Sequence, residues 1–262
     1  MYTIDKLRKK IAEGKLLVGC NSMLSDPSIS ELYGLCGCDY VWIDMEHAPL
    51  DYAATQQHII AAQAGGASAF VRVPWVDLVW TKRIIDMGPN AIIFPMIRTA
   101  EDAKNAIAYC LYPPEGVRGW NPVRASKYGT LDVEWYRDNI KNNMWRIILI
   151  EHIDAVNNID AILDVEGIDA IILGPSDLSG SMGCLLDIYS DEVQNKLTYV
   201  AKKAREKGIL VGADIRAGTS AEKMKVWIDK GISFISVGQD VHLLSDGVKA
   251  NMETIKHALA LE

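Results

Sequence analysis

The sequence predicts a single (β/α)8 barrel, and three observations support this fold class. Short apolar runs recur along the chain with helical stretches between them, which is the pattern of a parallel sheet buried on both faces. There are eight such runs, the number of strands that closes a barrel. The 262 residues are 49% hydrophobic, enough for one sizeable core, so residues 1–262 are expected to form one domain.

The eight apolar runs give the expected strands, and the segments between them give the helices. Apolar residues at three- and four-residue spacing in segments such as 81–87 and 220–230 predict crossover helices. An amphipathic helix carrying Ile4, Leu7 and Ile11 precedes the first strand and is expected to cap the barrel floor. A last helix is expected from about Gly247 to Leu261. The strands are expected at about 16–22, 39–44, 69–73, 91–96, 146–151, 170–174, 209–213 and 233–237.

One long connection interrupts this alternation, from Tyr112 to Asn143. Its Tyr112-Pro113-Pro114-Glu115-Gly116 start breaks any helix. Long connections in compact domains are usually functional or disordered. A doubly wound open sheet is the competing architecture, but the chain continues Asn21-Ser22-Met23-Leu24 after its first strand and lacks the glycine-rich phosphate turn of that fold.

Composition excludes several classes of function. The formal net charge is -7 and the two signs are mixed along the chain, so a nucleic-acid surface is not expected. No apolar stretch is long enough to span a membrane, and the start of the chain lacks the pattern of a signal peptide. Five cysteines without a CxxC pair favour a reducing compartment, so a cytoplasmic location is expected.

Polar side chains gather where the apolar runs stop, and in a barrel these positions share the face on which active sites lie. Asp44, Glu46 and His47 follow the second strand, Arg72 ends the third, and Glu151 ends the fifth. The sixth is followed by Gly174-Pro175-Ser176-Asp177. These strand ends are therefore the expected active site.

Glu151 and Asp177 close neighbouring apolar strands. Burying an unpaired carboxylate costs on the order of several kcal/mol of free energy, so a cation must lie nearby. Oxygen ligands without a cysteine cluster favour Mg²⁺ or Mn²⁺ over a structural zinc. The competing interpretation pairs each carboxylate with an arginine or lysine.

Arg72, His47 and Asp86 each admit two interpretations from local sequence. Arg72, flanked by valines, needs a carboxylate partner from the protein or from a substrate. His47 is either a hydrogen-bonded structural residue or a catalytic base. Asp86 sits near a helix end, where a solvated or capping carboxylate is the ordinary interpretation.

Taken together, the motifs resemble a known family. Asp44-x-Glu46-His47-Ala48-Pro49, Arg72-Val73-Pro74, Tyr112-Pro113-Pro114-x-Gly116-x-Arg118-Gly119, Ile150-Glu151 and Gly174-Pro175-Ser176-Asp177-Leu178-Ser179 occur in this order. Each is weak alone, but the set is similar to the HpcH/HpaI family of class II pyruvate aldolases over almost the whole chain. The resemblance implies a last helix exchanged between subunits, and a hexamer built as a trimer of dimers.

The resemblance also implies a role for each residue of the site. Glu151 and Asp177 bind a divalent metal, Mg²⁺ or Mn²⁺ and possibly Co²⁺, which chelates pyruvate. Arg72 stabilises the enolate, and His47 acts as the base, with Asp86 raising its basicity and Asp44 among the catalytic residues. Gly174, Ser176 and Asp177 receive the substrate carboxylate, and Ser126 in the long loop contacts the aldehyde portion. The implied reaction cleaves a 4-hydroxy-2-oxo acid into pyruvate and an aldehyde.

The chain departs from the family pattern at Leu149, where a glutamine is usual. His152 and the segment 119–122 also differ from many members. These changes indicate a bulkier or more apolar acceptor than in the heptanedioate or glucarate aldolases. An enzyme that decarboxylates oxaloacetate and condenses the enolate, and a catalytically idle barrel that binds a small acid, are the alternatives.

Overall fold

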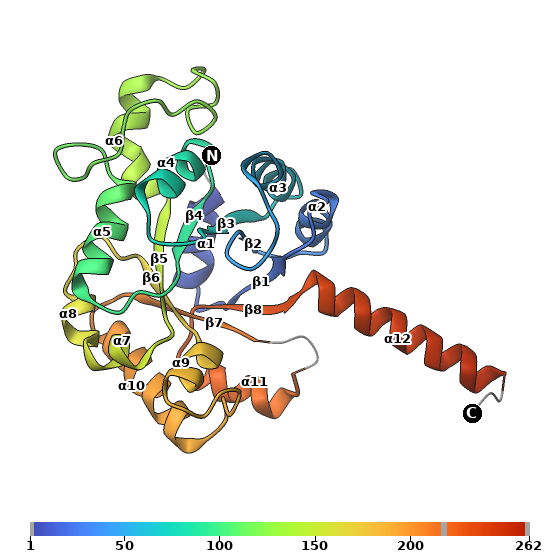
Figure 1. Cartoon of the computed structure of the whole chain (residues 1–262). Helices are drawn as coiled ribbons and strands as arrows, with labels where there is room; N and C mark the ends of the chain where they lie inside the picture. Colours follow the sequence, from blue (N-terminus) through green and yellow to red (C-terminus); the bar gives the residue numbers. More distant parts are fainter. Residues whose placement is uncertain (1–2, 216–218, 260–262) are drawn as a thin grey trace.

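The computed structural model describes residues 3–215 and 219–259, and its strands form one closed, all-parallel barrel in the order β1 to β8 (Figure 1). The (β/α)8 prediction is confirmed. The strands are β1 Leu17–Ser22, β2 Tyr40–Asp44, β3 Ser68–Arg72, β4 Ala91–Phe94, β5 Trp145–Ile150, β6 Ala170–Leu173, β7 Leu210–Asp214 and β8 Phe234–Gln239.

Helices surround the barrel. They are α1 Thr3–Ala12, α2 Ser28–Leu35, α3 Tyr52–Ala64, α4 Leu78–Asp86, α5 Ala100–Cys110, α6 Val133–Asn143, α7 Ile153–Asn157, α8 Ile159–Leu163, α9 Pro175–Ser181, α10 Asp191–Glu206, α11 Ala221–Ile228 and α12 Asp240–Ala258. Within the described residues, no helix is long and apolar enough to cross a membrane.

Two apolar clusters explain why the barrel forms. One fills the barrel interior with side chains such as Trp42, Phe70 and Leu149, and the buried Ile4 and Leu7 of α1 belong to it. The other packs the outward faces of the strands against the helices. α1 therefore closes the amino end of the barrel, as its amphipathic pattern predicts.

Two boundaries differ from the sequence prediction. The long connection is shorter than expected because α6 occupies its second half, beginning where the Asp132 carboxylate accepts the Trp135 N–H at 2.7 Å. The proline and glycine residues prevent a helix only in the first half of the connection. α12 begins at Asp240, earlier than the predicted start at Gly247, because the helix continues through that glycine.

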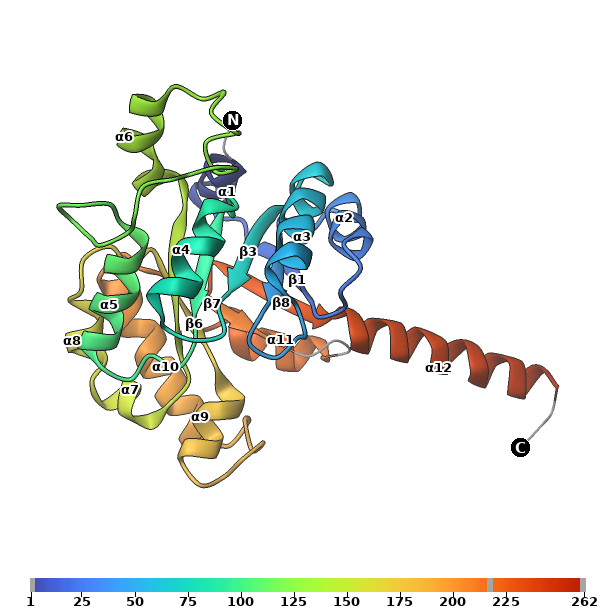
Figure 2. The same cartoon turned by 45° about the horizontal axis from the view of Figure 1, so that its top comes forward.

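α12 projects away from the barrel in both views (Figures 1 and 2). Of its residues that are assigned, only Asp240 is buried, and large apolar side chains are exposed along it. These are Leu243, Leu244, Val248, Met252 and Ile255.

Candidate active site at the carboxyl ends of the strands

Arg72 ends β3 and pairs with two carboxylates from the neighbouring strand and its loop. Its register partner on β2 is Asp44. Arg72 Nε donates to Asp44 Oδ1 at 3.0 Å, Nη2 donates to Oδ2, and Nη1 lies 2.8 Å from Glu46 Oε2. The guanidinium carbon lies 5.1 Å from the Trp42 ring centroid. Two protein carboxylates therefore pair with this buried cation and fix its orientation.

Asp44 is fully buried and joins β3 to the loop after β2. Besides binding Arg72, its Oδ1 accepts the backbone N–H of Glu46 at 2.9 Å and of His47 at 3.3 Å. The charge of Arg72 offsets the cost of burying this carboxylate. The geometry gives Asp44 a positioning role, since one side chain holds both the guanidinium and the His47 backbone.

Glu46 belongs to the same cluster, although the sequence analysis assigned it no role. Burial raises the pKa of Glu46, the Arg72 charge opposes this rise, and the negative charge of Asp177 adds to it. The sequence signal was its place between Asp44 and His47, directly after a buried strand. Its side chain reaches Arg72 because the loop follows β2, which is paired with β3.

His47 lies at the rim of this cluster. Its side chain is 60% exposed, and Nε2 lies 3.7 Å from Glu46 Oε2. The imidazole is therefore open to an incoming ligand.

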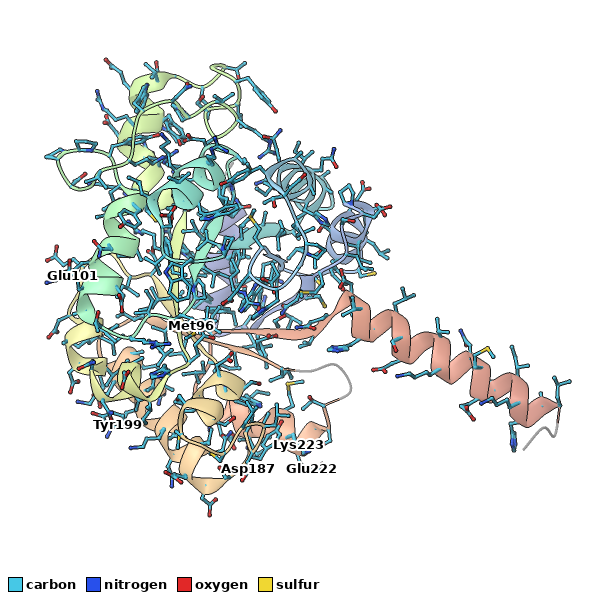
Figure 3. The ribbon with its side chains drawn as sticks, viewed as in Figure 1. Met96, Glu101, Asp187, Tyr199, Glu222 and Lys223 are labelled. Atoms are coloured by element: carbon cyan, nitrogen blue, oxygen red, sulfur yellow. The ribbon has the colours of Figure 1, made fainter. Side chains whose placement is uncertain are left out.

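Glu151 follows β5 and is almost fully buried. Its Oε1 accepts the backbone N–H of Met96 at 2.7 Å. Met96 has φ 55°, a conformation that non-glycine residues adopt rarely, and it lies near the carboxyl ends of the strands (Figure 3). Burial raises the pKa of Glu151 to about 7, and the charges of Glu46 and Asp177 act in the same direction.

Gly174 lies beside Glu151, and Ser176 and Asp177 follow it in the first turn of α9. The Gly174 N–H donates to Ile150 O at 3.1 Å, which places the start of α9 next to the end of β5. A Cβ on Gly174 would lie 2.5 Å from the Cβ of Glu151, so only glycine allows this approach. Ser176 and Asp177 are exposed on the first turn of α9.

The chemistry of these donors fits a hard divalent cation. Glu151 is a buried carboxyl that the charges of Glu46 and Asp177 disfavour in its ionised form, and a cation between Glu151 and Asp177 would reverse this. Over residues 3–215 and 219–259, no group of three or more His, Cys, Asp or Glu side chains is arranged to hold an ion. Two carboxylates would therefore leave ligand positions open.

Asp86 and Ser126 lie away from this cluster in their own chain. α4 runs back from β3 to the start of β4, so Asp86 at its end lies at the amino ends of the strands. Its Oδ1 accepts Arg118 Nη2 at 2.6 Å, and its carbonyl accepts the Ala125 N–H at 3.0 Å. Ser126 Oγ donates to Val123 O at 3.2 Å. The expected pairing of Asp86 with His47 is not formed within a single chain.

Leu149 is a buried member of the interior cluster and lies opposite Ile172 of β6. The barrel interior is apolar at this layer, just beneath Glu151. A leucine here packs against other apolar side chains, where a glutamine would need polar partners.

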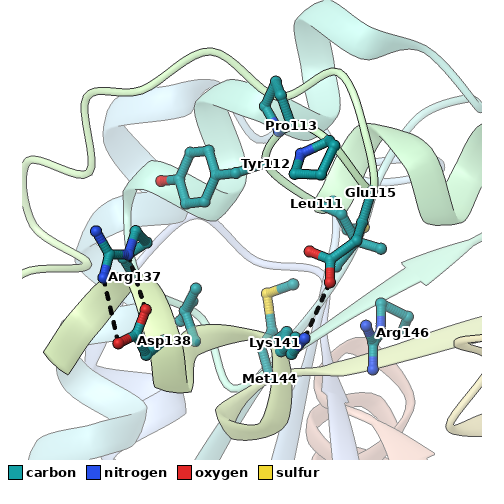
Figure 4. Close-up of a pocket in the computed structure, with 12 residues that line it drawn as sticks. Leu111, Tyr112, Pro113, Glu115, Arg137, Asp138, Lys141, Met144 and Arg146 are labelled. Carbon is teal, nitrogen blue, oxygen red and sulfur yellow. Dashed lines mark hydrogen bonds and ion pairs between the residues drawn. The ribbon is translucent and has the colours of Figure 1, made fainter. Parts of the chain in front are cut away.

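Two of the cavities formed by the described residues lie at opposite ends of the barrel. One of about 640 Å³ opens at the carboxyl ends of β6, β7 and β8, and Ser176 contributes to its lining. The other, of about 430 Å³, lies between the end of α5 and α6 (Figure 4). Four of its charged side chains pair with one another, Lys141 with Glu115 at 3.0 Å and Arg137 with Asp138 at 2.7 Å, and Arg146 pairs with Asp169 at 2.8 Å. Only the first cavity adjoins the candidate site.

Comparison with known proteins gives a match over most of the chain. A family model described as HpcH/HpaI aldolase/citrate lyase matches residues 18–247. A 5-keto-4-deoxy-D-glucarate aldolase from Salmonella arizonae is 32% identical over 253 residues, which cover 96% of this chain and 97% of that protein.

Solved structures agree with this match. An HpcH/HpaI aldolase from Desulfitobacterium hafniense superposes with a TM-score of 0.87 at 29% identity, covering 95% of this chain and 96% of that one. The citrate synthase SbnG superposes with a TM-score of 0.85 at 25% identity, covering 96% and 98%.

Proposed function

The chain belongs to the HpcH/HpaI aldolase/citrate lyase family and is a carbon–carbon lyase, and from this premise we propose that it cleaves a 4-hydroxy-2-oxo acid into pyruvate and an aldehyde. The observation that carries this proposal is the convergence of Arg72, Glu151 and Asp177 at one end of the barrel. Cleavage leaves an enolate of pyruvate, whose negative charge needs a fixed positive group. Arg72 supplies such a group, since Asp44 and Glu46 hold its guanidinium in place.

A divalent cation is the second positive group in this proposal, held by Glu151 and Asp177. When bound, it would polarise the 2-keto group of the substrate. Mg²⁺ and Mn²⁺ suit two carboxylate ligands with open positions, and Co²⁺ is a further candidate. The backbone from Gly174 to Asp177 begins α9 and is placed to receive the substrate carboxylate.

His47 is the proposed base. The 4-hydroxyl must lose a proton as the carbon–carbon bond breaks, and an imidazole accepts protons near neutral pH. Its exposure leaves it free to approach a bound substrate, while its backbone is held by Asp44. The proposed mechanism needs no lysine and forms no Schiff base.

In this proposal, Asp86 and Ser126 contribute to the active site of a neighbouring copy of the chain. Both lie at the amino ends of the strands of their own barrel. A hexamer built from dimers would bring that end of one barrel to the site of another. The exposed apolar side chains of α12 are compatible with the exchange of this helix between subunits.

A second candidate function uses oxaloacetate. Decarboxylation of oxaloacetate yields the same enolate, which then condenses with another carbonyl compound. The likeness to SbnG, a protein named as a citrate synthase, supports only the condensation step of this candidate, in which a carbon–carbon bond forms. The third candidate is a barrel that binds a small acid without catalysing a reaction. It requires that a protein which retains Arg72, Glu151 and Asp177 converts no substrate. For the protein as a whole we propose a cytoplasmic location, in keeping with its free cysteines.

Pyruvate release tests these candidates. The enzyme is assayed with several 4-hydroxy-2-oxo acids and with oxaloacetate, in Mg²⁺, Mn²⁺ or Co²⁺ and after chelation. Release from the hydroxy-oxo acids that stops on chelation supports the aldolase. Pyruvate release from oxaloacetate alone favours the second candidate. The absence of pyruvate release from every compound favours the barrel that binds a small acid without catalysis.

A further inference from the structure

Two cysteines that have no role in the proposed reaction lie in contact on the outer side of the barrel. Cys20 is in β1, and Cys38 lies in the turn that joins α2 to β2, two elements that lie beside β1 (Figure 1). Their Sγ atoms are 3.9 Å apart, and both thiols are free. Both side chains pack with the apolar cluster between the strands and the helices. They therefore face away from the barrel interior.

Backbone hydrogen bonds hold Cys38 beside β1. Its N–H donates to Tyr33 O at 3.1 Å, and the N–H of Asp39, the next residue, donates to Val18 O at 2.7 Å. The Asp39 carboxylate in turn accepts the Val18 N–H at 3.1 Å. Cys20 lies two residues further along β1. The fold therefore keeps the two sulfurs near each other.

The turn that carries Cys38 leaves room for the sulfurs to close. A disulfide bond is about 2.0 Å long, so the two atoms must approach by about 2 Å. Gly37 has φ 94°, and a Cβ at this position would meet no atom within 4 Å. The turn is therefore open to solvent beside Cys38. Rotation of the Cys38 side chain and a small shift of this turn would bring the sulfurs together.

The two thiols differ in reactivity. Cys38 is partly exposed, whereas Cys20 is only 6% exposed. The hydrogen bond with Cys20 lowers the pKa of Cys38, and burial opposes this effect. The same hydrogen bond raises the pKa of Cys20, and burial adds to the rise. A thiolate is the form of cysteine that attacks an oxidant, so Cys38 reacts first and Cys20 second.

Cys110 of α5 provides a contrast within the same chain. It is buried, and its thiol donates to the backbone oxygen of Ala106 at 3.2 Å. Burial raises the pKa of Cys110 to about 12, so it stays a neutral thiol at neutral pH. The reactivity of Cys38 comes from its partial exposure and from the Cys20 sulfur beside it, and Cys110 has neither.

We propose that Cys20 and Cys38 form a reversible disulfide when the protein meets hydrogen peroxide. This modification site goes beyond the proposed lyase function, and no step of that reaction uses it. A thiol such as dithiothreitol would reduce the bond by thiol–disulfide exchange and restore both cysteines.

The oxidation has two balanced steps. The Cys38 thiolate attacks one peroxide oxygen, so an S–O bond forms, the O–O bond breaks, and the hydroxide that leaves takes a proton from solvent. The Cys20 thiol then attacks the sulfenic sulfur of Cys38. The S–S bond forms, the S–O bond breaks, and the second hydroxide takes the Cys20 proton. The two sulfurs together lose two electrons, the peroxide gains them, and two waters are released.

The test exposes the reduced protein to hydrogen peroxide, blocks the remaining thiols with N-ethylmaleimide, and maps the peptides by mass spectrometry without reduction. Cleavage after Glu31 separates Cys20 from Cys38 in the sequence, so only a disulfide joins their peptides. The wild type should lose two of its five thiols and give this joined pair. Dithiothreitol should restore all five thiols. Cys36→Ser, which removes the exposed neighbouring cysteine, is the matched control and should form the same bond.

Two variants separate the steps. Cys20→Ala should stop the oxidation at the sulfenic acid of Cys38, which dimedone traps. Cys38→Ser should slow the loss of the Cys20 thiol by at least about tenfold, because a buried thiol without a reactive partner is inert. Thermal unfolding followed by circular dichroism checks that each variant folds. If buried Cys20→Ala does not fold, Cys38→Ser and Cys36→Ser decide the result.

Three results would overturn the proposal. They are five intact thiols in the wild type at peroxide concentrations that oxidise glutathione, a bond between Cys36 and Cys38 that leaves the two peptides unlinked, and oxidation of Cys38 to a sulfinic acid while Cys20 stays a thiol. Equal loss of the Cys20 thiol in the wild type and in Cys38→Ser would also contradict it. None of these readouts uses turnover, so they are independent of the proposed lyase reaction.

Discussion

Asp44 and Arg72 occupy the same register position on β2 and β3, and their side chains meet through both carboxylate oxygens. The pair places a fixed positive charge at the mouth of the barrel, beside Glu46. The reactive end of the site is therefore built on strands, which hold side chains more rigidly than loops do.

Replacing Arg72 by alanine should lower pyruvate release by at least about 10²–10³, as removal of a group that stabilises developing charge does. It should also lower the free energy of unfolding by about 3–5 kcal/mol, because buried Asp44 loses its cation. Steady-state assays and urea unfolding measure the two effects. Unchanged activity in a folded Arg72→Ala protein would remove Arg72 from the mechanism.

His47→Ala should lower the rate by about 10²–10⁴ if His47 is the base. The side chain is 60% exposed, so the unfolding midpoint should stay close to that of the wild type. His257→Ala, on exposed α12, is the matched control and should leave the rate unchanged. A His47→Ala enzyme as fast as the control would assign the proton transfer to another group.

Two inactive variants should restore each other if neighbouring copies complete the site. Arg72→Ala and Asp86→Ala chains, unfolded together and refolded as a mixture, should recover up to about a quarter of wild-type activity, since half of the chains keep Arg72 and half of their neighbours keep Asp86. Arg72→Ala mixed with His47→Ala should recover none, because both residues lie at one end of one barrel. Equal recovery in both mixtures, or none in the first, would contradict action across subunits.

Leu149→Gln should destabilise the protein by about 1–3 kcal/mol, because it buries an amide within the apolar interior cluster. Leu149→Met, a volume-conserving change, should cost less than about 1.5 kcal/mol. Urea unfolding of the two variants gives the comparison. A Gln variant as stable as the Met variant would show that polar partners exist at this layer.

Asp214 should make stability depend on pH. Its pKa is raised to about 6 in the folded protein by burial, so its contribution is fully present below its ordinary pKa near 4 and is lost as pH rises through 6. Relative to wild type, Asp214→Asn should therefore gain about 1 kcal/mol in unfolding free energy between pH 5 and pH 7. A constant difference over this range would show that Asp214 titrates normally.

The sequence predicted the barrel and the residues at its strand ends, because a buried parallel strand gives a continuous apolar run that ends at a polar residue. It assigned no role to Glu46, and it missed the early start of α12. It paired Asp86 with His47 without saying whether the two residues come from one chain or from two, because motif order carries no information about which end of a barrel a helix reaches. Only the direction of α4 shows that Asp86 lies at the opposite end.

The most direct test of the account is exchange of the pyruvate methyl protons with D2O, followed by proton NMR with and without added metal. We expect exchange in Mg²⁺, Mn²⁺ or Co²⁺ that stops on chelation, returns when metal is restored, and is lost in Glu151→Gln and Asp177→Asn. Exchange that continues in chelator, or that survives in both variants, would contradict a metal held between Glu151 and Asp177.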